Sequence, residues 1–163
     1  LGDVYKRQVQ VHPFFLPESG GIASSDLPSA LLSDTRDFEL IRYDQDAILQ
    51  FRGDDRFDQA FAFDPDAPDV LGMAAVKDGE ILGMAGASAD SPLFWQIGIN
   101  VNKNFEGRHI ASGIVSILKA DILQKGIVPY YGTSFSNLAS QHVAAKAGFE
   151  VAWVELITEK TEY

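Results

Sequence analysis

The chain has 163 residues, 46% of them hydrophobic and none of them cysteine, and its formal net charge is −10 at pH 7. This length predicts one domain with a core of its own, and the lack of cysteine excludes disulfides and thiolate chemistry. Residues 1–92 hold 7 basic and 17 acidic side chains whereas residues 93–163 hold 6 of each. Because a nucleic-acid binder needs the opposite balance, nucleic acid is excluded as an expected partner. The sequence contains neither a long apolar run nor a signal-peptide pattern, so we expect no membrane partner and a cytoplasmic location.

The first part of the chain carries weak structural signals. Residues 1–8 resemble translated adapter sequence, and we expect them to be a non-native leader outside the fold. Residues 9–36 show no clear period and are interpreted as loop with a possible short helix. A strand is possible at 38–44, and 46–63 mixes helical spacing with many acids. The prolines of "DPDAP" (64–68) then predict a break, because each disfavours helix in the preceding residue.

Clearer strand signals follow that break. The apolar stretches 70–76 and 80–87 flank the turn "KDG", whose Asp78 and Gly79 tolerate positive φ, so they predict a hairpin. A third apolar stretch, 93–101, follows a second turn. These three strands are predicted to form an antiparallel meander.

Helices and strands alternate in the rest of the chain. A helix is predicted at about 108–125 and ends at Gly126, a residue suited to a left-handed cap. A strand at 127–133, a helix at 136–148 and a strand at 149–158 complete the order β-β-β-α-β-α-β. A crossover helix joins parallel strands, so the predicted fold is a mixed α/β sheet: an antiparallel meander followed by a parallel pair, with helices on both faces.

Small residues gather where the first long helix begins, at Gly107, Ala111, Ser112 and Gly113. The first amides of a helix lack backbone partners, and its dipole is positive there, so such a start can hold a phosphate group. The motifs of Walker loops and of dinucleotide-binding folds are absent. Tight packing of the helix on the sheet explains the same residues equally well, and both interpretations remain open.

Two stretches resemble the GNAT superfamily of acyl-CoA-dependent N-acyltransferases. "VNKNFEGRHIAS" (101–112) is similar to the family's pyrophosphate loop, and "NLASQHVAAKAGFE" (137–150) is similar to its Asn-containing helix that ends in Gly-Phe. The resemblance covers about 70–158 and makes 67–163 the acyl-CoA-binding core, within a single domain that includes 9–66. Three positions depart from the family's pattern. Glu106 and His109 replace an Arg/Gln and a Gly of the loop, and Ala144 stands where many members have a catalytic Tyr.

The resemblance implies transfer of an acetyl group from acetyl-CoA, the co-substrate, to an amine of a small molecule or peptide. Residues 9–66 would then build the acceptor pocket. The departures suggest an alternative, a non-catalytic module with the same fold that binds acyl-CoA or a partner.

The resemblance also implies a set of binding residues. The backbone of β-strand residues would bind pantetheine, loop amides would bind pyrophosphate, and two helix residues would lie beside the thiol. These candidates are Ile99, Val101, Gly107, Arg108, His109, Ile110, Ala111, Ser112, Asn137 and Ser140.

The missing family tyrosine leaves the acid and the base to be found among other residues. The candidates are Tyr131, Asn100 and His142, with Tyr130 and Gln96 as further substitutes. Tyrosines in a strand are also ordinary core residues, and His142 could be an ordinary exposed helix residue. Trp95 could line an acceptor pocket or belong to the core. The three histidines have no metal-site spacing, so no metal is expected.

Overall fold

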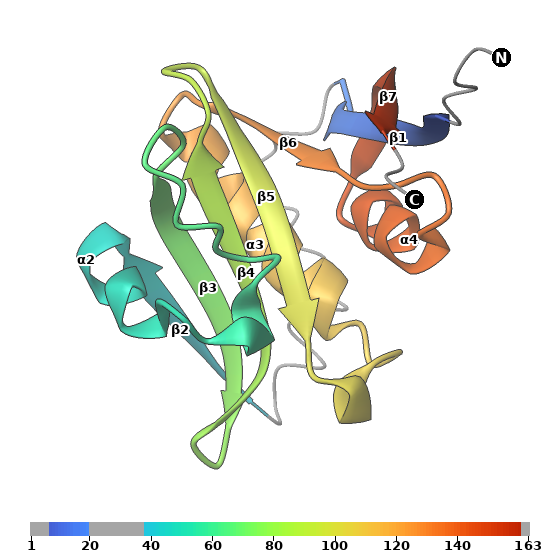
Figure 1. The fold of residues 1–163 in the computed structure, drawn as a ribbon. Coiled ribbons are helices and arrows are strands. Elements are labelled where there is room, and N and C mark those ends of the chain that lie inside the picture. Colours follow the sequence, from blue (N-terminus) through green and yellow to red (C-terminus); the bar gives the residue numbers. More distant parts are fainter. Residues whose placement is uncertain (1–6, 20–37, 161–163) are drawn as a thin grey trace, which may run out of the picture.

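The computed structural model describes residues 7–19 and 38–160. Seven strands form one sheet in the order β2-β3-β4-β5-β6-β1-β7 (Figure 1). All neighbouring strands are antiparallel except β5 and β6, which are parallel. The strands are β1 (Arg7–Pro17), β2 (Glu39–Asp44), β3 (Asp69–Lys77), β4 (Glu80–Ala89), β5 (Phe94–Val101), β6 (Val128–Gly132) and β7 (Phe149–Lys160).

Helices cover both faces of this sheet. The longer helices α3 (Ile110–Gln124) and α4 (Leu138–Lys146) lie on one face. The short α2 (Gln45–Ile48), two single 3-10 turns at Leu49–Phe51 and Asp55–Phe57, and the chain that follows them lie on the other. The predicted mixed sheet, with an antiparallel meander, a parallel pair and helices on both faces, is therefore confirmed.

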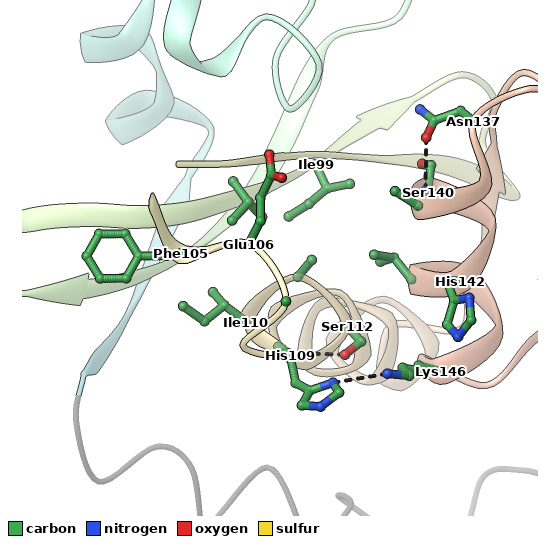
Figure 2. Close-up of a pocket in the computed structure, with 15 residues that line it drawn as sticks. Ile99, Phe105, Glu106, His109, Ile110, Ser112, Asn137, Ser140, His142 and Lys146 are labelled. Carbon is green, nitrogen blue, oxygen red and sulfur yellow. Dashed lines mark hydrogen bonds between the residues drawn. The ribbon is translucent and has the colours of Figure 1, made fainter. Parts of the chain in front are cut away.

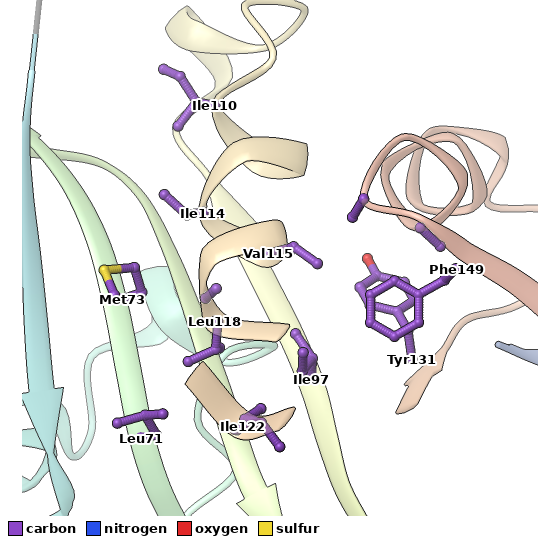
Figure 3. Packing of buried hydrophobic residues seen from close by; sticks show 14 of the residues in the cluster. Leu71, Met73, Ile97, Ile110, Ile114, Val115, Leu118, Ile122, Tyr131 and Phe149 are labelled. Atoms are coloured by element: carbon purple, nitrogen blue, oxygen red, sulfur yellow. The ribbon is translucent and has the colours of Figure 1, made fainter. Parts of the chain in front are cut away.

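Helix α3 forms because its apolar residues recur four positions apart. Ile114, Leu118 and Ile122 are each at most 1% exposed, and they pack on the strands together with Ile110 (Figure 3). At its end Gly126 adopts a φ of +75° and donates to the Leu123 carbonyl, the expected left-handed cap. Among the described residues, no helix is long and apolar enough to cross a membrane.

The opposite face of the sheet carries a second core of aromatic rings. Phe51 and Phe57 meet edge to face with ring centroids 5.3 Å apart, and they belong to the same buried cluster as Ala74 and Met84. The chain then crosses the sheet as residues 58–63, a turn at 58–60 followed by irregular chain, which we call the strap. It lies directly on the backbone of β4 and β5.

Two glycines permit this close approach of the strap. A Cβ placed on Gly98 would lie 1.8 Å from the Gln59 carbonyl oxygen, and one placed on Gly86 would lie 1.9 Å from the Ala60 carbonyl oxygen. Gly86 and Gly98 are direct partners across β4 and β5. Any side chain at either position would therefore lift the strap from the sheet.

The interpretation of 9–36 as loop or short helix is wrong for residues 9–17, which belong to β1. This strand inserts between β6 and β7 and is antiparallel to both. As a result β6 and β7 are not neighbours, and the sheet has one parallel pair. Most of the expected leader lies outside the described residues, but Arg7 and Gln8 begin β1, and the rest of 9–36 is described only as far as residue 19.

We expect Leu118→Ala to lower the free energy of unfolding by about 2–5 kcal/mol, because it empties space in the core that neighbouring atoms refill only in part. Urea denaturation followed by circular dichroism measures this loss. Leu93→Ala is the matched control, since it removes the same atoms from a side chain that is 63% exposed. Equal losses in the two variants would contradict the assignment of α3 as the centre of this core.

Candidate active site

Strands β5 and β6 part in the middle of the sheet. Their parallel pairing runs from Phe94 with Val128 to Ile97 with Tyr131 and then stops. The pairing therefore ends four residues before β5 does at Val101. Beyond Ile97, the side of β5 that faced β6 has no strand partner, and the gap between the strands opens toward both faces of the sheet.

On the helical face, the gap leads into a cleft of about 470 Å³ between α3 and α4, which we call the α3–α4 cleft (Figure 2). Nine of the ten predicted cofactor-binding residues line it, and Arg108 is the exception. The nine predicted residues that line the cleft are Ile99, Val101, Gly107, His109, Ile110, Ala111, Ser112, Asn137 and Ser140.

The wall at the start of α3 includes backbone amides that have no partner within the helix. The first backbone bond of the helix runs from the Gly113 amide to the His109 carbonyl, 3.0 Å away. The preceding helical amides thus have no partner within the helix. Gly107, with a φ of +76°, has nothing within 4 Å of an added Cβ, so the cleft is open at this point. The unpartnered amides at the start of α3 and the positive end of the helix dipole suit an anion.

The charged side chains around this wall differ from the sequence-based expectation. The Arg108 guanidinium lies over the Phe105 ring, 5.2 Å from its centroid, and lines a neighbouring cleft of about 290 Å³. Instead Lys146 of α4 supplies a cation, with its Nζ 3.2 Å from Nδ1 of His109 (Figure 2). Sequence reasoning missed Lys146, although it stands four residues after His142 and therefore on the same helix face.

Opposite the helices, the gap leads into a second cleft of about 530 Å³ beside the strap, which we call the strap cleft. His12 and Phe14 of β1 line it, together with Asp58 and Asp69. Asp69 is 7% exposed and accepts a hydrogen bond of 2.8 Å from the Phe63 amide. Burial raises the pKa of this carboxyl, although backbone hydrogen bonds act in the opposite direction.

The two clefts share three lining residues, Ile99, Asn137 and Ser140. At this junction the Tyr131 hydroxyl lies 2.6 Å from the Ser140 hydroxyl. Burial raises the pKa of Tyr131, so this phenol is protonated at neutral pH. Asn137 accepts from the Ser140 amide at 3.0 Å and thereby caps α4.

Of the other candidates, Asn100 lines neither described cleft, because its side chain is bonded to the strap. His142 is exposed and lines only the α3–α4 cleft. Gln96 lines the strap cleft and accepts from the Tyr130 hydroxyl at 3.2 Å, and Tyr130 also bonds Asp90. Burial, followed by the Asp90 carboxylate, raises the pKa of Tyr130. Trp95 packs against the helical core.

Solved structures of acetyltransferases share this fold. A GCN5-related N-acetyltransferase-like protein from Streptococcus suis matches with a TM-score of 0.68 over 98% of this chain and 64% of its own, at 16% identity. A tandem GNAT protein from the clavulanic acid biosynthesis pathway matches with a TM-score of 0.64 over 96% of this chain and 55% of its own, at 13% identity. An aminoglycoside N-acetyltransferase in complex with CoA matches with a TM-score of 0.52 over 77% of this chain and 92% of its own, at 23% identity.

At sequence identities this low, the matches to solved structures establish only that the fold is shared. The chain spans less than two thirds of the length of the Streptococcus protein and of the tandem protein. No curated protein sequence matches the chain. The family model of GNAT acetyltransferases does match, over residues 32–149, which is most of the sequence. The chain belongs to the GNAT acetyltransferase family.

Proposed function

We propose that this chain is an acyl-CoA-dependent N-acyltransferase, which moves an acetyl group from acetyl-CoA to an amine of a small molecule or peptide. The main support is the junction of the two clefts at the parting of β5 and β6. A thioester that enters from the α3–α4 cleft and an amine that enters from the strap cleft would meet there. Family membership supplies the acyl-CoA chemistry.

The α3–α4 cleft suits the phosphates and the pantetheine arm of acyl-CoA. The open amides at the start of α3 would hold the diphosphate, with Lys146 adding a positive charge. The Leu93 carbonyl bonds the Val128 amide, so alternate residues of β5 direct their backbone toward β6. Ile99 and Val101 follow this alternation past the end of the pairing, and their backbone groups would bind pantetheine as an added strand does.

In the proposed reaction, the nitrogen of a neutral amine attacks the thioester carbonyl carbon. A C–N bond forms, the C–S bond then breaks, and the nitrogen loses its proton to solvent. Tyr131 would donate its hydroxyl proton to the departing thiolate and recover a proton from solvent through Ser140. Its raised pKa suits an acid rather than a base. The shared cleft would add positioning, which lowers the barrier by holding both reactants together.

A second candidate function is a non-catalytic module that binds acyl-CoA. It is favoured by Ala144, a buried residue at the position of the family's usual tyrosine, and by Glu106, a carboxylate that lines the cleft expected to hold phosphates. Such a module would use the strap cleft for recognition without acyl transfer.

Calorimetric titration with acetyl-CoA, followed by a free-thiol release assay over a panel of amines, separates the two candidates. Binding with amine-dependent thiol release supports the acyltransferase. Binding without release from any amine supports the non-catalytic module. No binding at millimolar acetyl-CoA would reject both.

Replacing Tyr131 by Phe tests the proposed acid. We expect kcat to fall by about 10²–10⁴-fold, the usual contribution of a general acid, while the Kd for acetyl-CoA stays unchanged because the phenol makes no contact required for binding. Tyr130→Phe is the matched control, since it removes the same hydroxyl from the neighbouring residue on the other face of β6. A kcat within threefold of wild type in the Tyr131 variant would rule out this role.

Replacing Lys146 by Met tests the proposed diphosphate cation. The loss of one charged contact should weaken acetyl-CoA binding by about tenfold, as measured by calorimetry at low salt. Arg108→Met removes an equal charge from a side chain that lines the neighbouring cleft. We expect this variant to change the Kd for acetyl-CoA by less than about threefold. A larger loss of acetyl-CoA binding in Arg108→Met than in Lys146→Met would indicate that Arg108, and not Lys146, contacts the diphosphate.

A further inference from the structure

The strap is fastened to the sheet by side chains at both of its ends. Oδ1 of Asn100 accepts from the amides of Gln59 and Ala60, at 3.0 and 2.8 Å. At the other end, the Asp69 carboxylate accepts from the Phe63 amide. At the Asn100 end the carbonyls of Gln59 and Ala60 lie directly on Gly98 and Gly86, so this end of the strap lies close against the sheet.

The same asparagine orients the first residue of the strap. Nδ2 of Asn100 donates to Oδ1 of Asp58 at 2.9 Å. Asp58 is exposed and lines the strap cleft. Within the described chain, no ion pair involves this carboxylate, and no hydrogen bond reaches its second oxygen. A fixed carboxylate therefore faces the cleft with one oxygen available.

The charge balance of the strap cleft is one-sided. Its described lining contains two carboxyl groups, Asp58 and Asp69, and the His12 imidazole, but no Lys or Arg. Asp69 is buried and already holds the strap backbone. Of the two carboxylates, Asp58 is thus the one that a ligand can reach, and a cation suits it best.

We propose that Asp58 determines acceptor specificity by binding a cationic group of the acceptor other than the amine that is acetylated. The acceptor class is then an amine with a second positive charge, such as an aliphatic diamine. Asn100 is a positioning residue in this scheme, since it holds Asp58 and the strap without touching the reacting atoms. This inference rests on the proposed acetyl transfer and adds the chemical class of the acceptor.

The test compares 1,5-diaminopentane with 1-aminopentane, which has the same chain without the second charge. With the wild-type protein and acetyl-CoA, we expect a KM for the diamine about tenfold below that for the monoamine, the value of one charged contact. Asp58→Asn should remove this difference by raising the KM for the diamine. The kcat values for both amines should remain within twofold of wild type.

Three variants complete the design. Asp58→Glu restores the charge and should recover part of the preference for the diamine. Asn100→Ala should raise the KM for the diamine while leaving the Kd for acetyl-CoA unchanged. Asp78→Asn removes an equal charge from the β3–β4 turn, at the opposite end of β4 from Ser88 of the strap cleft, and should change nothing.

Several outcomes overturn the proposal. Equal KM values for the diamine and the monoamine in the wild-type protein would show that it has no site for the second positive charge. A fall in kcat for both amines in Asp58→Asn would indicate that this carboxylate accepts a proton instead. If Asp78→Asn lost the preference for the diamine to the same extent as Asp58→Asn, the preference would come from the long-range electrostatic field of the protein and not from a contact with Asp58.

Direct binding separates failure of this inference from failure of the proposed function. If thiol is released from neither amine, acetyl transfer to such amines fails, but calorimetric titration of both amines into the CoA-saturated protein still measures the preference. A diamine Kd about tenfold below that of the monoamine, lost in Asp58→Asn, supports the inference. Equal Kd values overturn it.

Discussion

The parting of β5 and β6 is the constraint on which the rest of this structure depends. Two strands that separate inside a sheet leave backbone groups without partners, and such groups are costly when buried. Strand β1 pairs with the other edge of β6 and holds that strand in place where β5 leaves it. Past the end of β6, the amides of Thr133 and Phe135 donate to the carbonyls of Pro13 and Val11 and so continue this β1 edge. The edges of β5 and β6 that faced each other therefore remain available to a ligand.

The two faces of the sheet present different charges at this gap, although the Glu106 carboxylate also lines the helical side. The helical face offers amides at the start of α3 and the ammonium group of Lys146, whereas the strap face offers Asp58 and Asp69. In the proposed reaction, an anionic thioester carrier and a cationic amine would therefore enter from different faces and meet at the junction beside Ser140. The acidic excess of residues 1–92 is consistent with this division, since the strap belongs to that part of the chain.

Local signals account for what the sequence predicts, and long-range contacts account for what it does not. The hairpin at Asp78 and Gly79 and the cap at Gly126 depend on residues that tolerate positive φ, and these positions have it. Strand β1 contains Pro13, which weakens its strand signal, and its partners in β7 lie about 140 residues away in the chain. Its own sequence therefore does not predict that it forms a strand. The polar atoms of Asn100 suggested chemistry, yet the strap that binds them is placed by Gly86 and Gly98, a contact that no local pattern reveals.

The glycines of the strap face explain how acceptor recognition can be separate from acyl-CoA binding. Gly86 and Gly98 carry the strap, and a Cβ on Gly132 of β6 would lie 2.6 Å from the Phe14 ring, so these glycines leave the strap and β1 room to form part of the cleft wall. The strap and β1 contribute Asp58 and His12 to the walls of the strap cleft, beside residues of the neighbouring strands and of α4. Neither residue belongs to the core that α3 packs in, so substitutions there can change the charge and shape of the cleft without altering that core. In the proposed reaction, the fold would keep one face fixed for the thioester and leave the other free to vary with the amine.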